Sequence, residues 1–220
     1  MKVNAAKTNL LVVSASKPYE ARGHIIDQDN HRVDCTNMLK ALGFTFNTRG
    51  DVSSQINVLC KKFRQKVWAL RHLRKSGFKE QELIKVYTSY MRPTVEYSAP
   101  IYHSMLSGEQ TLQLKRLQYF ALKNIFGFEY SHRKFLELAD LPTLEERRKS
   151  MTEKFARKTA DNPQFNKWFP TTRVGIRRKN RTEYKELQAR MNRRQNSPLY
   201  YYWRILNKHR VNYDVRTSMK

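Results

Sequence analysis

The spacing of apolar residues divides the chain into a strand-rich beginning and a helical remainder. Leu10–Ser14 is a short apolar run rich in branched residues, which predicts a strand buried on both faces. His24–Ile26 and Arg32–Cys35 flank a polar turn and predict a hairpin. Leu42–Phe46 alternates large and small side chains and predicts a further strand. Residues 1–50 are therefore expected to form a small, mostly antiparallel sheet.

From Asp51 onward the apolar residues recur with a helical period. Asp51 with Ser53 and Ser54 provides N-cap chemistry, and Gly77 stops the helix because glycine takes the left-handed conformation without steric cost. Between them, spacings of three and four place one apolar stripe on the helix. The stripe consists of Ile56, Leu59, Cys60, Phe63, Val67, Leu70 and Leu73.

Two prolines follow the next predicted helix. Residues 79–91 have a helical apolar period, and Pro93 and Pro100 are expected to break or kink the chain after it. The side chains expected to face inward are Leu83, Val86, Tyr87 and Tyr90.

Three later helices have recognisable ends. They are expected over residues 107–127, 133–140 and 142–160, where a serine, a glycine or a proline marks the boundaries. The apolar positions of the first are Leu114, Leu117, Ala121, Leu122 and Ile125. Residues 51–170 are thus expected to form an all-α bundle, and the chain is predicted to have an α+β fold.

The last 50 residues are basic and carry one aromatic cluster. Residues 171–220 contain 14 Lys and Arg against 3 Asp and Glu. Apolar residues are sparse there until residues 199–203, which with Ile205 and Leu206 predict one short terminal helix. This segment is expected to be a loosely ordered basic tail with an aromatic anchor.

Composition and charge restrict the class of protein. The 220 residues contain 43 Lys and Arg and 19 Asp and Glu, a formal net charge of +24, with 40% hydrophobic residues. That hydrophobic fraction is too high for a disordered polycation, and the excess charge predicts a polyanionic partner. Cys35 and Cys60 cannot form a disulfide framework, and no apolar run is long enough for a signal sequence or a membrane span. An intracellular protein of the nucleus or cytoplasm, without membrane contact, is expected.

The predicted helix after Asp51 has basic residues only. Residues 52–79 contain no Asp or Glu, whereas a solvated helix face usually mixes both signs. Binding to a nucleic-acid backbone is the preferred interpretation, and a merely soluble face is the alternative. The candidate nucleic-acid-binding residues of this helix are Lys61, Lys62, Arg64, Lys66, Arg71, Arg74 and Lys75.

The tail offers a second set of phosphate-binding side chains. Residues 200–203, three tyrosines and a tryptophan, either stack on unpaired bases or dock on the helical core as a terminal staple. Basic runs of this kind also serve nuclear import, and the sequence leaves these alternatives open. The candidate nucleic-acid-binding residues of the tail are Arg177, Arg178, Lys179, Arg181, Arg193 and Arg194.

No catalytic or metal centre is visible in the residue pattern. The six histidines lack the spacing of metal ligands, and no glycine-rich phosphate loop occurs. Acidic pairs with the chemistry to hold Mg²⁺ are limited to Asp27 with Asp29 and Glu145 with Glu146. The first pair lies in an expected hairpin turn and the second in the first turn of a helix, so local structure explains both.

Four segments, in their order and spacing, carry a resemblance to a known family. Residues 1–8 read MKVNAAKT before an apolar run, and Leu42-Gly43-Phe44 follows; residues 92–97 read RPTVEY, and residues 141–148 read LPTLEERR. Together they resemble the C-terminal part of the reverse transcriptase of non-LTR (LINE-type) retrotransposons. The first two segments are similar to palm motif D and to motif E, the primer grip; the other two are similar to steps in the helical region after the palm.

This resemblance implies a fold and a role. Residues 1–50 would be the end of the polymerase palm, residues 51–170 a thumb with a C-terminal extension, and residues 171–220 the basic tail. In this family the thumb grips the primer–template, so RNA, DNA or an RNA–DNA hybrid is the implied partner, with the catalytic palm as another. Lys7 matches the motif D lysine, a proton donor to the leaving pyrophosphate; otherwise it is a surface lysine before a strand.

The catalytic aspartates of the family have no counterpart here. Those enzymes bind two Mg²⁺ ions through aspartates of motifs A and C, which precede motif D, and this chain begins at motif D. The chain alone is therefore expected not to polymerise DNA and to bind no cofactor, the Mg²⁺ belonging to the parent polymerase. It is expected to be a C-terminal segment of an RNA-directed DNA polymerase; the alternative is a host-adopted basic adaptor that binds nucleic acid or protein without a polymerase role.

Overall fold

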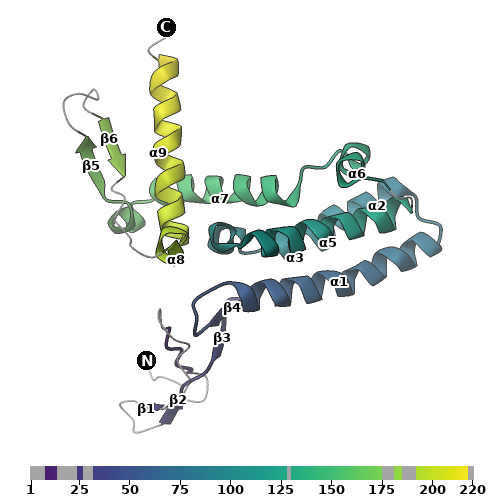
Figure 1. Ribbon diagram of the computed structural model, residues 1–220, viewed down its shortest axis with the longest axis horizontal. Helices are drawn as coiled ribbons and strands as arrows, with labels where there is room; N and C mark the ends of the chain where they lie inside the picture. The colour runs from purple at the N-terminus through teal and green to yellow at the C-terminus, as the bar shows by residue number, and fades with distance from the viewer. Residues whose placement is uncertain are drawn as a thin grey trace. The chain divides into compact units, whose positions relative to one another are not determined.

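The computed structural model describes residues 8–13, 24–26, 32–127, 130–174, 181–184 and 192–217 (Figure 1). The chain divides into two compact units, residues 1–62 and 63–220, with the boundary inside the first long helix. Short antiparallel hairpins combined with a largely helical remainder confirm the predicted α+β class. The strands are β1 (His24–Ile26), β2 (Arg32–Asp34), β3 (Met38–Ala41), β4 (Phe44–Asn47), β5 (Thr171–Val174) and β6 (Arg181–Tyr184).

Helices account for most of the second unit. The long ones are α1 (Ser53–Lys75), α5 (Gly108–Phe126), α7 (Leu144–Ala160) and α9 (Pro198–Thr217). The shorter α-helices are α2 (Glu80–Val86), α3 (Arg92–Glu96), α4 (Ala99–Tyr102), α6 (His132–Ala139) and α8 (Asn192–Gln195). The described residues also contain one π-helical turn, η2 (Tyr87–Met91), and two 3₁₀ segments, η3 (His103–Met105) and η4 (Pro163–Trp168).

The first unit contains two antiparallel hairpins. β1 pairs with β2, as predicted, and β3 pairs with β4. Leu42 and Gly43 form the two-residue turn of the second hairpin, with φ values of 48° and 78°. Positive φ at both positions matches the twist of the flanking strands, but it places a leucine where Gly, Asn or Asp is usual. The strand predicted over Leu42–Phe46 therefore begins two residues later, at Phe44.

The strand predicted over Leu10–Ser14 is wrong. Leu10 makes one isolated parallel bridge to Cys35, and residues 11–13 belong to no strand. Val13 is 53% exposed, and Ser14 lies outside the described residues. A strand that is buried on both faces is paired along its length and covered on each face. Among the described residues, this run pairs only at Leu10.

The start of α1 is fixed by a cluster of polar side chains. Asp51 accepts hydrogen bonds from the Asn47 side chain (2.8 Å) and the backbone N–H of Ser53 (2.9 Å), as its N-cap chemistry predicts. Burial opposes the charge of Asp51, but these hydrogen bonds lower its pKa below the usual value. Gln55, fully buried, accepts from the backbone N–H of Thr45 at 2.9 Å, so the helix is also bonded to β4.

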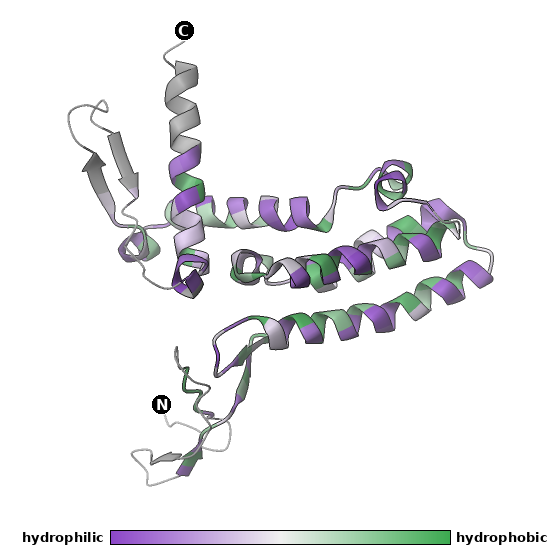
Figure 2. Ribbon diagram, in the orientation of Figure 1, coloured by the Kyte–Doolittle hydropathy of each residue, from purple (hydrophilic) through white to green (hydrophobic). Residues whose placement is uncertain are grey.

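The apolar stripe predicted for this helix is confirmed. Its residues from Ile56 to Leu70 are buried, and Leu73 is half-buried. Hydrophobic and hydrophilic bands consequently alternate along α1, as they do along α5 (Figure 2). The helix ends before Gly77, which has a φ of 90° and is accommodated by the absence of a Cβ atom.

The helical path after α2 continues through Pro93, so of the predicted break or kink the break does not occur there. In η2 the backbone N–H of Arg92 donates to the carbonyl of Tyr87, five residues earlier. This wider turn relieves the clash between a proline ring and the carbonyl four residues before it. The turn occurs instead at Ser98, with a φ of 61°, and Pro100 lies in the first turn of α4.

The same π-helical turn corrects the predicted inward face. Leu83 and Tyr87 are buried and Val86 is half-buried, but Tyr90 is 52% exposed. A π-helical turn holds more residues than an α-helical one. The side chains within it and after it are therefore rotated away from the face that regular α-helical spacing predicts. Met91 takes the buried position instead.

The ends predicted for α5 and α7 are confirmed by their caps. Ser107 Oγ accepts from the backbone N–H of Gln110, whose side chain accepts from the backbone N–H of Ser107. Thr143 and Glu146 form the same reciprocal pair at α7. These bonds to Thr143 lower the pKa of Glu146, which therefore stays ionised at the positive end of the helix dipole.

Two buried polar side chains connect α7 to the rest of the bundle. Gln118 of α5, 1% exposed, donates to the carbonyl of Pro142 and accepts from the backbone N–H of Leu144, both at 3.0 Å. Glu96, 7% exposed, accepts two hydrogen bonds from Arg147, at 2.8 and 3.2 Å. Arg92 forms a second ion pair with the same carboxylate at 3.1 Å.

The described residues of the tail are folded onto the helical unit. β5 pairs with β6, and α9 packs against α7. Tyr200, Tyr202, Trp203 and Leu206 form a buried cluster with Ala156 of α7 and with Phe169. The predicted short terminal helix is a helix of 20 residues, because an aromatic face anchored at its start allows the polar residues that follow to extend it.

Replacing the buried carboxylate of Glu96 is expected to destabilise the protein. The Glu96→Ala variant leaves two guanidinium groups without their anion, and the free energy of unfolding should fall by about 2 kcal/mol, measured by urea denaturation. Glu137→Ala is the matched control, since Glu137 also pairs with two cations, Arg133 and Lys134, but is 52% exposed. The control should lose less than about 0.5 kcal/mol; equal losses would contradict a buried ionic anchor.

Candidate nucleic-acid interface

The exposed side of α1 carries a continuous basic face. Arg64, Trp68, Arg71, His72 and Lys75 are all exposed, and at about 100° per residue they lie on one side of the helix. We call these five residues the exposed basic face. Because α1 contains no acidic residue, none of its cations is paired within the helix. The surface is therefore positive along its length.

An aromatic stack interrupts this face, and the residue pattern alone did not predict it. Trp68 is 65% exposed, and its ring stacks on the imidazole of His72 with centroids 4.7 Å apart and an interplanar angle of 23°. Side chains four residues apart on a helix are neighbours on its surface. The sequence signal for the stack was therefore a Trp-x-x-x-His spacing within a segment that has no acidic residue. The stack presents a flat π surface to solvent between two cations.

Three of the seven predicted phosphate-binding residues of α1 contact the protein itself. Lys66 donates to the carbonyl of Tyr90 and to Thr94, both at 2.7 Å, and lies 4.0 Å from the Tyr90 ring centroid. Arg71 donates to the Asn124 side chain at 2.7 Å and lies over the Phe120 ring. These bonds fix α1 to η2 and α5, so Lys66 and Arg71 both have contacts within the protein itself.

Arg74 has a structural contact as well. Its guanidinium donates to the carbonyls of Asn124 and Phe126 at the C-terminus of α5, where a cation offsets the negative end of the helix dipole. Gly127 follows with a φ of 73°, and a Cβ atom there would collide with this guanidinium. The remaining predicted residues of α1, Lys61, Lys62, Arg64 and Lys75, are exposed.

The other predicted site residues are spread over the chain. Leu42 is 94% exposed at the tip of the β3–β4 turn, next to Gly43, while Phe44 is buried at the start of β4. Arg194 is exposed on α8; Arg193 lies on the same helix and Arg181 in β6, with side chains outside the described part. Lys7, Arg177, Arg178 and Lys179 lie outside the described residues.

The tail aromatics are core residues. Tyr202 donates to the carbonyl of Pro100 and Trp203 to that of Trp168, each at 2.9 Å. Tyr200, Tyr202 and Trp203 are at most 9% exposed, so the terminal-staple alternative holds and stacking on unpaired bases does not. Tyr201, half-buried, hydrogen-bonds to His103 Nε2 at 3.2 Å.

The described residues contain no group of three or more His, Cys, Asp or Glu side chains that could hold a metal ion. Glu145 and Glu146 lie in the first turn of α7, as predicted, while Asp27 and Asp29 lie outside the described residues. Within the same described ranges, no helix is long and apolar enough to cross a membrane.

Protonation of His103 is expected to destabilise the fold. Burial, reinforced by the charges of Arg148 and Lys149, lowers the pKa of His103 to about 4. Below pH 6.5 the unfolded chain binds a proton that the folded chain does not accept until about pH 4, so the free energy of unfolding should fall as the pH decreases through that window. His103→Gln should flatten this dependence in urea titrations between pH 7 and 4, and an unchanged slope would contradict it.

Comparison with known proteins adds no assignment to this site. No protein-family model matches the chain, and neither the curated proteins nor the solved structures include a match. The interpretation of the exposed basic face therefore rests on its own geometry and charge.

Proposed function

We propose that this chain binds RNA or DNA through the exposed basic face of α1, as the thumb of a non-LTR reverse transcriptase would. The observation that carries the proposal is the exposed Trp68–His72 stack between Arg64 and Lys75, on a helix without acidic residues. A polyanion neutralises the positive charge of the face, and a nucleobase stacks on its exposed aromatic ring. Few partners other than a nucleic acid supply both.

The dimensions of the face suit a sugar–phosphate backbone. Arg64 and Lys75 are eleven residues apart, which corresponds to about 16 Å along the helix axis. At about 3.4 Å per phosphate along one strand, this length covers about five phosphates. Arg71 lies between the two ends, held in place by Phe120 and Asn124. Cations positioned in this way neutralise several phosphates without losing further side-chain freedom.

The position of α1 in the chain supports the thumb interpretation. The helix follows directly after the segment that resembles the primer grip, as a thumb helix does in the family that the sequence resembles. A stacking residue beside phosphate-binding cations suits a junction, where paired and unpaired nucleotides meet. The chain is then the nucleic-acid grip of a polymerase whose catalytic aspartates are provided by a palm outside these residues.

Removing the terminal cations of the face should weaken binding and reduce its salt dependence. For the double variant Arg64→Gln/Lys75→Gln, we expect affinity for a 20-base-pair RNA–DNA hybrid to fall about tenfold at low salt. The slope of log K against log salt should become shallower by about 2, since two phosphate contacts are lost. Fluorescence anisotropy at several salt concentrations measures both quantities.

The matched control carries the same change of charge elsewhere. Lys154→Gln/Lys158→Gln replaces two exposed lysines of α7, and the salt slope of this variant should stay within about 0.5 of the wild-type value. Equal weakening by both double variants would mean that net charge, rather than the exposed basic face, determines binding. Absence of binding to any hybrid, RNA or DNA would favour the adaptor alternative.

Removing the indole should weaken binding to unpaired nucleotides selectively. Trp68→Ala is expected to lower affinity for single-stranded RNA by about 5- to 150-fold, the range for loss of one base–aromatic stack, and to leave affinity for blunt duplex nearly unchanged. Trp168→Ala is the control, because Trp168 is also exposed, at 55%, but lies in η4. If the two variants behave alike in anisotropy titrations, Trp68 is not a stacking residue.

A further inference from the structure

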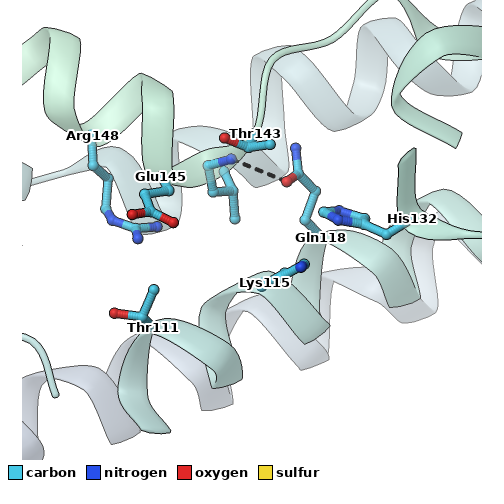
Figure 3. A pocket seen from close by; sticks show the side chains of 8 residues that line it. Thr111, Lys115, Gln118, His132, Thr143, Glu145 and Arg148 are labelled. Carbon is cyan, nitrogen blue, oxygen red and sulfur yellow. Dashed lines mark hydrogen bonds between the residues drawn. The ribbon is translucent and has the colours of Figure 1, made fainter. Parts of the chain in front are cut away.

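A second polar site lies between α5, α6 and α7, separate from the exposed basic face. It is a cavity of about 90 Å³, well above the volume needed to hold one water molecule. Thr111, Lys115 and Gln118 line it from α5, His132 from α6, and Glu145 and Arg148 from α7 (Figure 3). The site thus lies between three consecutive helices of the chain.

Arg148 is the unusual residue of this cavity. Its side chain extends from α7 toward the space above Thr111 (Figure 3), and the residue is 1% exposed. Its Nε and Nη1 atoms are buried and have no hydrogen-bond partner among the described residues. Burial lowers the pKa of this guanidinium, because the charge has lost most of its water. A buried cation with unsatisfied donors is costly unless an anion accepts its hydrogen bonds.

The neighbouring side chains do not satisfy these donors. Glu145, exposed one turn earlier on α7, attracts the guanidinium electrostatically but accepts no hydrogen bond from Nε or Nη1. Gln118 donates to the carbonyl of Pro142 and accepts from the backbone N–H of Leu144, and Figure 3 shows the second of these bonds. Arg148 is therefore a buried cation with two donor atoms that have no acceptor among the described residues.

Two further nitrogen groups line the same cavity. Lys115 adds a second positive charge from α5. His132 Nε2 is buried without a hydrogen-bond partner among the described residues. Burial, followed by the charge of Lys115, lowers the pKa of His132, so the imidazole is neutral in the absence of an anion. Thr111 and Thr143 have already committed their hydroxyl protons, to Ser107 and Glu146.

We propose that this cavity binds a phosphate group, held by Arg148 and Lys115 with His132 at its far end. A phosphate oxygen accepts hydrogen bonds and donates few, which matches the buried groups without a partner here, the nitrogens of Arg148 and His132, while the one carboxylate of the lining, Glu145, is exposed. Its charge offsets both cations, and a tetrahedral anion reaches donors in several directions, which a planar carboxylate does not. The group is either free inorganic phosphate or the terminal phosphate of a nucleotide. This site uses no residue of the exposed basic face.

Thermal denaturation with inorganic phosphate tests the site. At constant ionic strength, maintained with sodium chloride, phosphate should raise the Tm of the wild-type protein in a saturable way, because a ligand that binds only the folded state stabilises it. Arg148→Met should bind phosphate at least tenfold more weakly. Lys149→Met, which removes the next, exposed cation of α7, should keep the wild-type response within twofold. No saturable rise, or equal rises in the wild type and Arg148→Met, overturns the proposal.

A second measurement needs no substitution of Arg148, so it is independent of any effect of that substitution on folding. In NMR titrations of the wild-type protein, phosphate should raise the pKa of the His132 imidazole, with the resonance assigned through His132→Gln. An unchanged His132 titration in saturating phosphate overturns the proposal. Adenosine monophosphate distinguishes the sources: displacement of phosphate by the nucleotide supports a nucleotide-borne group, and binding of inorganic phosphate alone supports the free ion. Neither result alters the prediction for the exposed basic face, which is measured by nucleic-acid affinity.

Discussion

The helical unit depends on one carboxylate that is removed from water. Glu96 is held by Arg147 at 2.8 Å and by Arg92 at 3.1 Å, so a segment that precedes α4 is bonded to the first turn of α7. Gln118 adds the second connection, through Leu144. Since α4, α5 and α9 all pack on α7, these bonds set the register of the helix that the others share.

Local chemistry determined what could be predicted from the sequence. Helix caps at Ser107 and Thr143 and the apolar stripe of α1 depend on neighbours three or four residues away, and these features were predicted correctly. The π-helical turn before Pro93 and the length of α9 depend on tertiary packing, and regular spacing does not encode them. Within the candidate site, charge alone identifies the basic residues of α1, whereas the Trp68–His72 stack depends on the orientation of two side chains, which charge does not encode.

Formal charge and available charge differ in this protein. Lys66, Arg71 and Arg74 use their donors to attach α1 to η2 and α5, and Arg147 neutralises Glu96. These cations therefore stabilise the packing of the helices. Those on α1 also fix the direction in which its exposed side faces. Arg148 belongs to neither group, because it is buried with two donor atoms unsatisfied among the described residues. The cations therefore fall into three classes: those bonded within the protein, those exposed on α1, and the buried Arg148. Their contacts distinguish these classes, which the net charge does not.

The docking of the last helix has a consequence for biosynthesis. Tyr202 bonds to the carbonyl of Pro100, a contact across 102 positions of sequence. A ribosome completes α4, α5 and α7 long before it delivers Trp203 and Leu206, so the apolar surface around Ala156 and Phe169 stays uncovered while the chain is still attached. A nascent chain at that stage presents a hydrophobic patch, which favours aggregation until α9 leaves the exit tunnel and covers it.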